Sequence, residues 1–265
     1  MSTATCNKHT ISTSYGASDI RVFEPSCGKI HGTIVTVHPW SFLGGGEHNT
    51  IGLARNVCNK GWRVITFTLK SMPLYLGGAI GGILFRHYYE VNHVTEVVEW
   101  AFEQYHTGSN GYTDQQMVLL GSSAGAPFAG SAMAKIQEHQ SQTKIAAFIA
   151  IGYTFGKLAS LGFGRHFTSV VDNYSTSNLC GSSSSSAQDD VEVPPKLFIM
   201  GEHDEFTSVD QLLSMVTRMK AISPNGTVDV DIVPRVGHFQ LESPSYDPIV
   251  AEKVVQWLND TILSS

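Results

Sequence analysis

The alternation of short apolar strands with longer helical segments constrains the fold of this chain most strongly. The segments Met117–Leu120 and Ala146–Ile151 are continuously apolar. A strand covered on both faces has this composition, whereas a strand with one face in water alternates apolar and polar residues. We therefore predict an α/β fold, with a mostly parallel central sheet and helices on both faces, in a single domain over residues 1–265.

The periodicity of the sequence assigns elements along this domain. Strands are expected over His9–Ser14, Ile20–Phe23, Thr33–Val37, Arg63–Thr68, Met117–Leu120, Ala146–Ile151, Lys196–Met200 and Val228–Val233. Helices are expected over Asn49–Asn59, Glu90–His106, Ala124–His139, Val209–Ile222 and Asp247–Leu263. Residues 16–19 form a turn signal, which predicts an antiparallel hairpin between the first two strands. Residues 153–191 have no clear period and predict a lid or a flexible insertion after strand 6.

Composition excludes several classes of protein. Hydrophobic residues make up 42% of the chain and charged residues only 15%, with a formal net charge of −6. This balance excludes a disordered chain and a charge-driven nucleic-acid binder. Four widely spaced cysteines and a polar N-terminus favour a cytoplasmic location without a secretory signal. The sequence has no uncharged run of roughly 20 residues that is apolar throughout, so no membrane span is expected.

Ser123 lies in the most informative local motif, Gly-Ser-Ser-Ala-Gly at residues 121–125. The motif follows an apolar strand and begins an apolar helix, which is the context of a nucleophile elbow. Ser123 has a glycine two residues away on each side, and Ser122 does not. The alternative role for Ser123 is that of a plain helix N-cap.

A serine nucleophile needs a base that is oriented by an acid. Asp204 and His238 both follow the ends of predicted strands, where ligands bind in open α/β sheets. The chain order Ser123, Asp204, His238 is that of α/β-hydrolase triads. Glu202 and Glu205 are rivals for the acid, and the alternative for His238 is a surface loop histidine.

An oxyanion hole needs two backbone N–H donors near the serine. Ala124, directly after the nucleophile, is the first expected donor. The second should come from the loop after Thr33–Val37, where Trp40 is the first choice because Pro39 has no N–H. Ser41 is the reserve donor. His38 in the same loop is expected to fix the loop by hydrogen bonding.

The sequence does not match the common motifs for binding a metal, a nucleotide or a dinucleotide. The histidines lack the HExxH spacing of a zinc site, and the glycines at 44–46 are not followed by the lysine of a P-loop. The glycines at 77–82 do not match the dinucleotide-binding fingerprint. We therefore expect neither a metal nor another cofactor, and a small molecule as the binding partner.

The four motifs GSSAG, GEHDEF, VGHF and HPWSFLGGG give the chain a resemblance to the α/β-hydrolase superfamily over nearly its whole length. The chain looks most like the small intracellular serine hydrolases in which His-Pro replaces the commoner His-Gly of the oxyanion loop. The resemblance implies an eight-stranded, mostly parallel sheet. It also implies Ser123 as nucleophile, Asp204 as acid and His238 as base.

Together these features predict a serine hydrolase that cleaves a carboxylic ester or thioester of a small, apolar molecule. The apolar segments 72–85 and 153–165 are the expected pocket walls, with Ser41, Leu76 and Phe163 as substrate-binding residues. Two rival hypotheses use the same fold. One is a small-molecule receptor, and the other is a triad used for acyl transfer, elimination or cyclisation.

Overall fold

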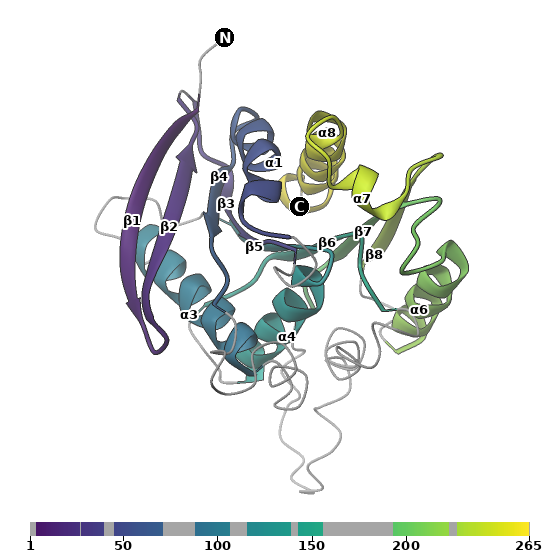
Figure 1. Ribbon diagram of the computed structural model, residues 1–265, viewed down its shortest axis with the longest axis horizontal. Coiled ribbons are helices and arrows are strands. Elements are labelled where there is room, and N and C mark those ends of the chain that lie inside the picture. The colour runs from purple at the N-terminus through teal and green to yellow at the C-terminus, as the bar shows by residue number, and fades with distance from the viewer. Residues whose placement is uncertain are drawn as a thin grey trace, which may run out of the picture.

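An eight-stranded sheet forms the centre of the protein, with its strands in the order β1-β2-β4-β3-β5-β6-β7-β8 (Figure 1). The computed structural model describes residues 4–26, 28–39, 45–70, 88–106, 116–138, 143–155, 193–222 and 227–264. The strands are β1 (Thr5–Thr13), β2 (Gly16–Glu24), β3 (Gly32–Val37), β4 (Arg63–Phe67), β5 (Gln116–Ser122), β6 (Ala147–Ile151), β7 (Lys196–Gly201) and β8 (Val228–Val233). β1 and β2 are antiparallel to their neighbours, and β3 to β8 run parallel to one another.

Helices cover both faces of this sheet (Figure 1). They are α1 (His48–Cys58), α3 (Tyr88–Tyr105), α4 (Gly125–Glu138), α6 (Val209–Ile222), α7 (His238–Leu241) and α8 (Asp247–Leu258). A π-helical turn over Asn259–Leu263 follows α8. α1 and α8 pack together on one face, and α3 and α4 pack together on the other. This arrangement confirms the predicted α/β fold.

The central strands are apolar on both sides because each side meets a helical layer. Along β5, Val118 and Leu120 belong to the core that contains residues of α1 and α8. Met117 and Leu119 point the other way, into the core that contains residues of α3, α4 and α6. The two-residue period of a strand divides one apolar run between two cores. The unbroken apolar runs of the sequence have this origin.

Some boundaries differ from the sequence expectations. The first two strands form the predicted hairpin, but its loop is Ser14–Tyr15, because Gly16 already pairs with Thr13 and has a φ of 90°. β5 continues past Leu120 to Ser122. The short helix α7 has no counterpart among the predicted elements. Residues 156–191 of the expected lid lie outside the described residues, and the single-domain organisation stays a prediction.

The parallel strands direct their carboxyl ends to one edge of the sheet. The segments after β3, β5, β6, β7 and β8 therefore begin at this edge, where α/β proteins bind their ligands. In the strand order, β4 lies on one side of β3 and β5 lies on the other. The connection after β3 and the connection after β5 therefore lead in opposite directions along the sheet. Among the described residues, no helix combines the length and hydrophobicity that a membrane span requires.

Candidate active site

Ser123 lies in a sharp turn between the end of β5 and the start of α4. Its φ of 51° is in the left-handed region, which is uncommon for residues other than glycine. A Cβ atom at Gly121 would overlap the backbone of Ala126, and one at Gly125 would overlap the carbonyl oxygen of His38. Both glycines are therefore required by close backbone contacts, and the turn has the geometry of a nucleophile elbow.

A continuous chain of hydrogen bonds joins Ser123, His238 and Asp204. The Ser123 hydroxyl lies 2.7 Å from His238 Nε2, and His238 Nδ1 lies 2.6 Å from Asp204 Oδ2. The other carboxylate oxygen of Asp204 accepts the backbone N–H groups of Phe206 and Thr207, each at 2.9 Å. Because these bonds orient the carboxylate, the imidazole presents Nε2 to the serine as a hydrogen-bond acceptor.

The two rival carboxylates make different contacts. Glu205 accepts the backbone N–H of His238 at 2.7 Å, so it holds the loop of the histidine and not its ring. Glu202 accepts the backbone N–H of Arg235 at 2.8 Å. Only Asp204 of these three acidic residues bonds to the imidazole Nδ1. The geometry therefore favours Asp204 as the orienting acid.

Glu242 is a further acidic side chain at the site, and the sequence motifs did not identify it. Its carboxylate is 8% exposed and accepts a hydrogen bond from the Ser122 hydroxyl at 2.8 Å. The same oxygen, Oε1, lies 4.0 Å from His238 Nε2. The spacing of four residues from His238 was the available signal, but it carries meaning only once α7 is known to form. The two neighbouring serines therefore have different hydrogen-bond partners: Ser122 bonds to Glu242, and Ser123 bonds to His238.

Three carboxylates raise the affinity of His238 for a proton. Burial alone lowers the pKa of the imidazole, but the hydrogen bond and charge of Asp204 raise it, with smaller contributions from Glu242 and Glu205. The net pKa of His238 is therefore above its ordinary value near 6.5. Burial also raises the pKa of Glu242, against the opposing effects of His238 and Ser122.

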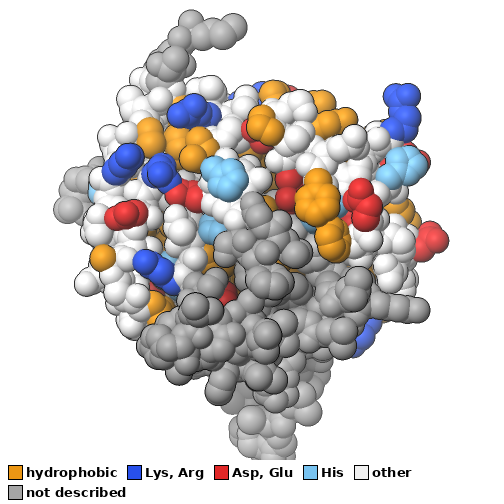
Figure 2. All heavy atoms as spheres, in the orientation of Figure 1, with side chains coloured by type: hydrophobic (Ala, Val, Ile, Leu, Met, Phe, Trp, Pro, Cys, Tyr) orange, Lys and Arg blue, Asp and Glu red, His pale blue; other side chains and the backbone are white. Residues whose placement is uncertain are grey.

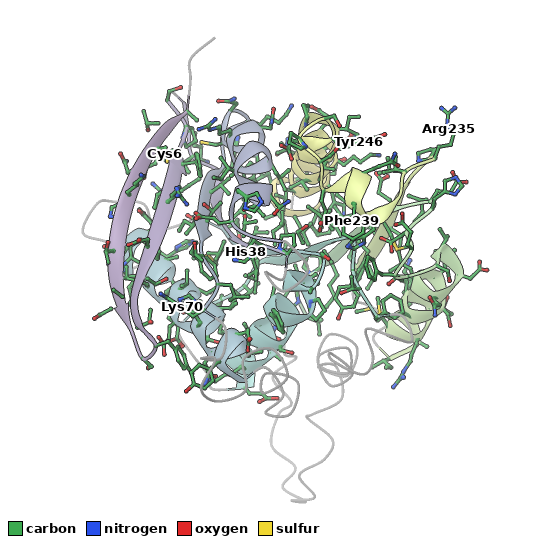
Figure 3. The ribbon with its side chains drawn as sticks, in the orientation of Figure 1. Cys6, His38, Lys70, Arg235, Phe239 and Tyr246 are labelled. Carbon is green, nitrogen blue, oxygen red and sulfur yellow. The ribbon has the colours of Figure 1, made fainter. Side chains whose placement is uncertain are left out.

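His38 fixes the loop after β3 by hydrogen bonding, as the sequence predicts. Leu69 donates its backbone N–H to His38 Nε2 at 2.8 Å, so this nitrogen carries no proton. His38 Nδ1 lies 2.5 Å from the carbonyl oxygen of Pro39 and donates to it. His38 lies near the middle of the view in Figure 3, and its side chain is buried. Burial lowers its pKa, which favours this neutral form.

His93 is a second buried histidine, and it binds Lys70, the residue that follows Leu69. Lys70 donates its backbone N–H to His93 Nδ1 at 2.9 Å, and His93 Nε2 lies 3.0 Å from the Ser18 hydroxyl. Burial lowers the pKa of His93 to about 4, assisted by the positive charge of Lys70. Two neutral histidines from different elements thus fix the segment that leaves β4.

The predicted oxyanion and pocket residues divide between described and undescribed parts of the chain. Ala124 is buried and directly precedes the first residue of α4, so its backbone N–H lies at a helix N-terminus. Trp40, Ser41, Leu76 and Phe163 lie outside the described residues. Their roles stay predictions. Among the described residues, no cluster of three or more His, Cys, Asp or Glu side chains is placed to hold a metal ion.

Comparison with solved structures shows that the chain has the α/β-hydrolase fold. An α/β serine hydrolase homologue from Coxiella burnetii has a TM-score of 0.62 at 17% identity, over 95% of this chain and 97% of that one. A serine hydrolase without a lid from Xanthomonas campestris gives 0.61 at 19% identity, over 95% and 94%. Carboxyl esterase 2 of the fungus Tuber melanosporum gives 0.69 at 14% identity, over 98% and 89%.

The sequence itself gives a narrower assignment. The family model of the prolyl oligopeptidase family matches residues 86–265, a span that includes Ser123, Asp204 and His238. The chain therefore belongs to the prolyl oligopeptidase family, and it is a serine hydrolase. The predicted membership of the α/β-hydrolase superfamily is confirmed. A comparison with curated proteins finds no match.

Gly152, which follows β6, provides a test of how the imidazole is positioned. Its φ is 57°, and a Cβ atom there would lie 3.0 Å from His238 Cε1. We expect Gly152→Ala to displace the ring and to lower kcat by about tenfold or more, because small misplacements of reacting groups are costly. Steady-state hydrolysis of p-nitrophenyl butyrate measures the loss.

The control for this substitution is Gly28→Ala. Gly28 also has a positive φ, of 92°, but a Cβ atom there meets nothing within 4 Å. This control variant should keep its kcat even if its melting temperature falls. Equal kcat values for Gly152→Ala and wild type would contradict the assigned position of His238.

Glu242→Gln tests the electrostatics of the site. A histidine acts as a general base only when neutral, so with His238 in the predicted role kcat/KM should decline as the pH falls through its raised pKa. Glutamine keeps an oxygen for Ser122 but removes the charge that helps to raise the pKa of His238, so the acidic limb should move to lower pH. Glu252→Gln, on a carboxylate that is 65% exposed and pairs with Lys60, should leave the profile unchanged. An unchanged or oppositely shifted profile for Glu242→Gln would exclude its influence on His238.

Proposed function

We propose that the protein hydrolyses a carboxylic ester or thioester of a small, apolar molecule through Ser123, His238 and Asp204. The observation that carries this proposal is the unbroken Ser–His–Asp hydrogen-bond chain, with distances of 2.7 Å and 2.6 Å. The left-handed turn at Ser123 supports it, because that turn presents the hydroxyl at the ligand-binding edge of the sheet.

In the first half of the reaction, Ser123 Oγ attacks the carbonyl carbon while His238 Nε2 takes the hydroxyl proton. Asp204 holds the ring in the required tautomer and stabilises the imidazolium. The backbone N–H groups of Ala124 and Trp40 bind the oxyanion of the tetrahedral intermediate, each contributing about 3 kcal/mol. The imidazolium then protonates the departing alcohol or thiol, which leaves an acyl group on Ser123.

The second half repeats these steps with water as the nucleophile. His238 removes a proton from water, and the resulting attack on the acyl group forms a second tetrahedral intermediate. Its collapse releases the carboxylic acid and returns the proton to Ser123. Acyl transfer to another acceptor would use the same first half, so analysis of the products with candidate acceptors present separates the two outcomes.

Labelling by a fluorophosphonate probe tests the nucleophile directly. We expect the wild type to react and Ser123→Ala to lose both labelling and, by about four orders of magnitude or more, its kcat. Ser122→Ala is the matched control, because the neighbouring hydroxyl bonds to Glu242 and not to the imidazole. Equal labelling of the wild type and Ser123→Ala would remove the basis of the mechanism.

The name of the matching family favours peptide hydrolysis as a second candidate function. A pair of anilides with one leaving group separates the two candidates. We expect butyryl p-nitroanilide and benzyloxycarbonyl-Gly-Pro p-nitroanilide to be cleaved at similarly low rates, each far below p-nitrophenyl butyrate. A clear preference for the prolyl anilide, lost in Ser123→Ala, would instead establish a proline-directed peptidase.

A further inference from the structure

An aromatic pair borders the base of the proposed triad. The ring of Phe206 lies 4.7 Å from that of His238, centroid to centroid, at 66°. The ring of Phe239 lies 5.5 Å from His238 and 5.6 Å from Phe206, at 87° and 80°. These are edge-to-face arrangements, which aromatic rings prefer. The two phenylalanines therefore extend the imidazole into a three-ring cluster.

Phe239 is the outer member of this cluster. It is 59% exposed, the largest exposed fraction among the large hydrophobic residues that the structure describes. Figure 3 shows Phe239 beside the ribbon of α7. In the space-filling view, hydrophobic side chains lie over α7 with acidic side chains beside them (Figure 2). A single exposed phenylalanine is unremarkable on a protein surface, but this one packs edge-to-face on the imidazole that would transfer the proton.

We propose that Phe206 and Phe239 form the binding site for the leaving group of the substrate, and that this group is a neutral aromatic alcohol. The inference rests on the proposed function. It assigns the chemistry of the alcohol half of the ester, which the triad alone leaves open.

The position of the pair relative to His238 assigns it to the alcohol and not to the acyl group. His238 Nε2 must deliver its proton to the departing oxygen, so the leaving group lies on the histidine side of the scissile bond. The oxyanion donor Ala124 lies in the turn after Ser123, at the start of α4. Phe206 and Phe239 pack against this imidazole, so we assign them to the group that His238 would protonate.

The charges around the cluster argue against an acidic leaving group. Asp204, Glu205 and Glu242 all raise the pKa of His238, so the potential near the ring is negative. An alcohol that carries a carboxylate or phosphate would be repelled there. A neutral ring can add a further edge-to-face contact to Phe206 and Phe239 without this penalty.

Matched esters with alcohols of similar acidity test the proposal. Benzyl butyrate and ethyl butyrate share the acyl group and differ in the presence of a ring. For Phe239→Ala we expect kcat/KM to fall about tenfold for benzyl butyrate and to stay within about twofold for ethyl butyrate. Phe239→Tyr, which keeps the ring, should restore the preference. Leu213→Ala, which removes another exposed apolar side chain on α6, should change neither value.

Several outcomes would overturn the inference. An equal loss for both esters would mean that Phe239 acts on the base, and a loss that follows acyl length would place the ring in the acyl site. A selective loss with choline butyrate instead of benzyl butyrate would indicate a cationic alcohol bound by the rings and carboxylates. If the wild type hydrolyses none of these esters, the proposed function itself fails, whereas turnover without a selective effect of Phe239→Ala refutes only the aromatic site.

Discussion

Parallel pairing of β5 with β3 and β6 determines where chemistry can take place in this protein. Parallel strands end at the same edge of a sheet, so loops that are distant in sequence begin side by side there. Ser123 and His238 are 115 positions apart, yet their side chains lie within 2.7 Å. Two apolar cores stabilise the sheet, and the pairing of its strands determines where the site residues lie.

The turn at Ser123 depends on a close contact between two connections of the sheet. The first turn of α4 approaches the end of β3 so closely that only glycine fits at position 125. The same β3 loop contains His38, which is bonded to Leu69. The turn at Ser123, the β3 loop and the segment after β4 are therefore linked, by the close backbone contact at Gly125 and by the hydrogen bond of the His38 side chain. A side chain at position 125 would force apart the turn at Ser123 and the end of β3.

The sequence predicted most of the fold because its strongest signals are local. Val209–Ile222 forms a helix with the predicted bounds, and all eight strands occur. The errors come from tertiary contacts. The hairpin loop lies before Gly16 because pairing extends to Thr13, and β5 reaches Ser122 because β3 and β6 continue beside it.

The candidate site divides in the same way. Ser123, Asp204 and His238 have sequence motifs, since each follows a strand in a recognisable turn. Glu242 and Gly152 have none, because their importance arises from distances to His238 that only the folded chain creates. Phe206 was part of a predicted acid turn, but its ring contact with the base was not predictable from spacing.

The two neutral histidines beside β4 give the protein a second response to acid, distinct from the titration of His238. A histidine in an unfolded chain takes up a proton near pH 6.5, whereas His93 in the folded protein does so only at about pH 4. Between these values the unfolded chain binds more protons than the folded one, so the free energy of unfolding decreases as the pH falls. Protonation finally removes the lone pair that accepts the Lys70 N–H. Acid would therefore loosen the chain after β4 as a structural event, even in a variant whose reaction no longer depended on His238.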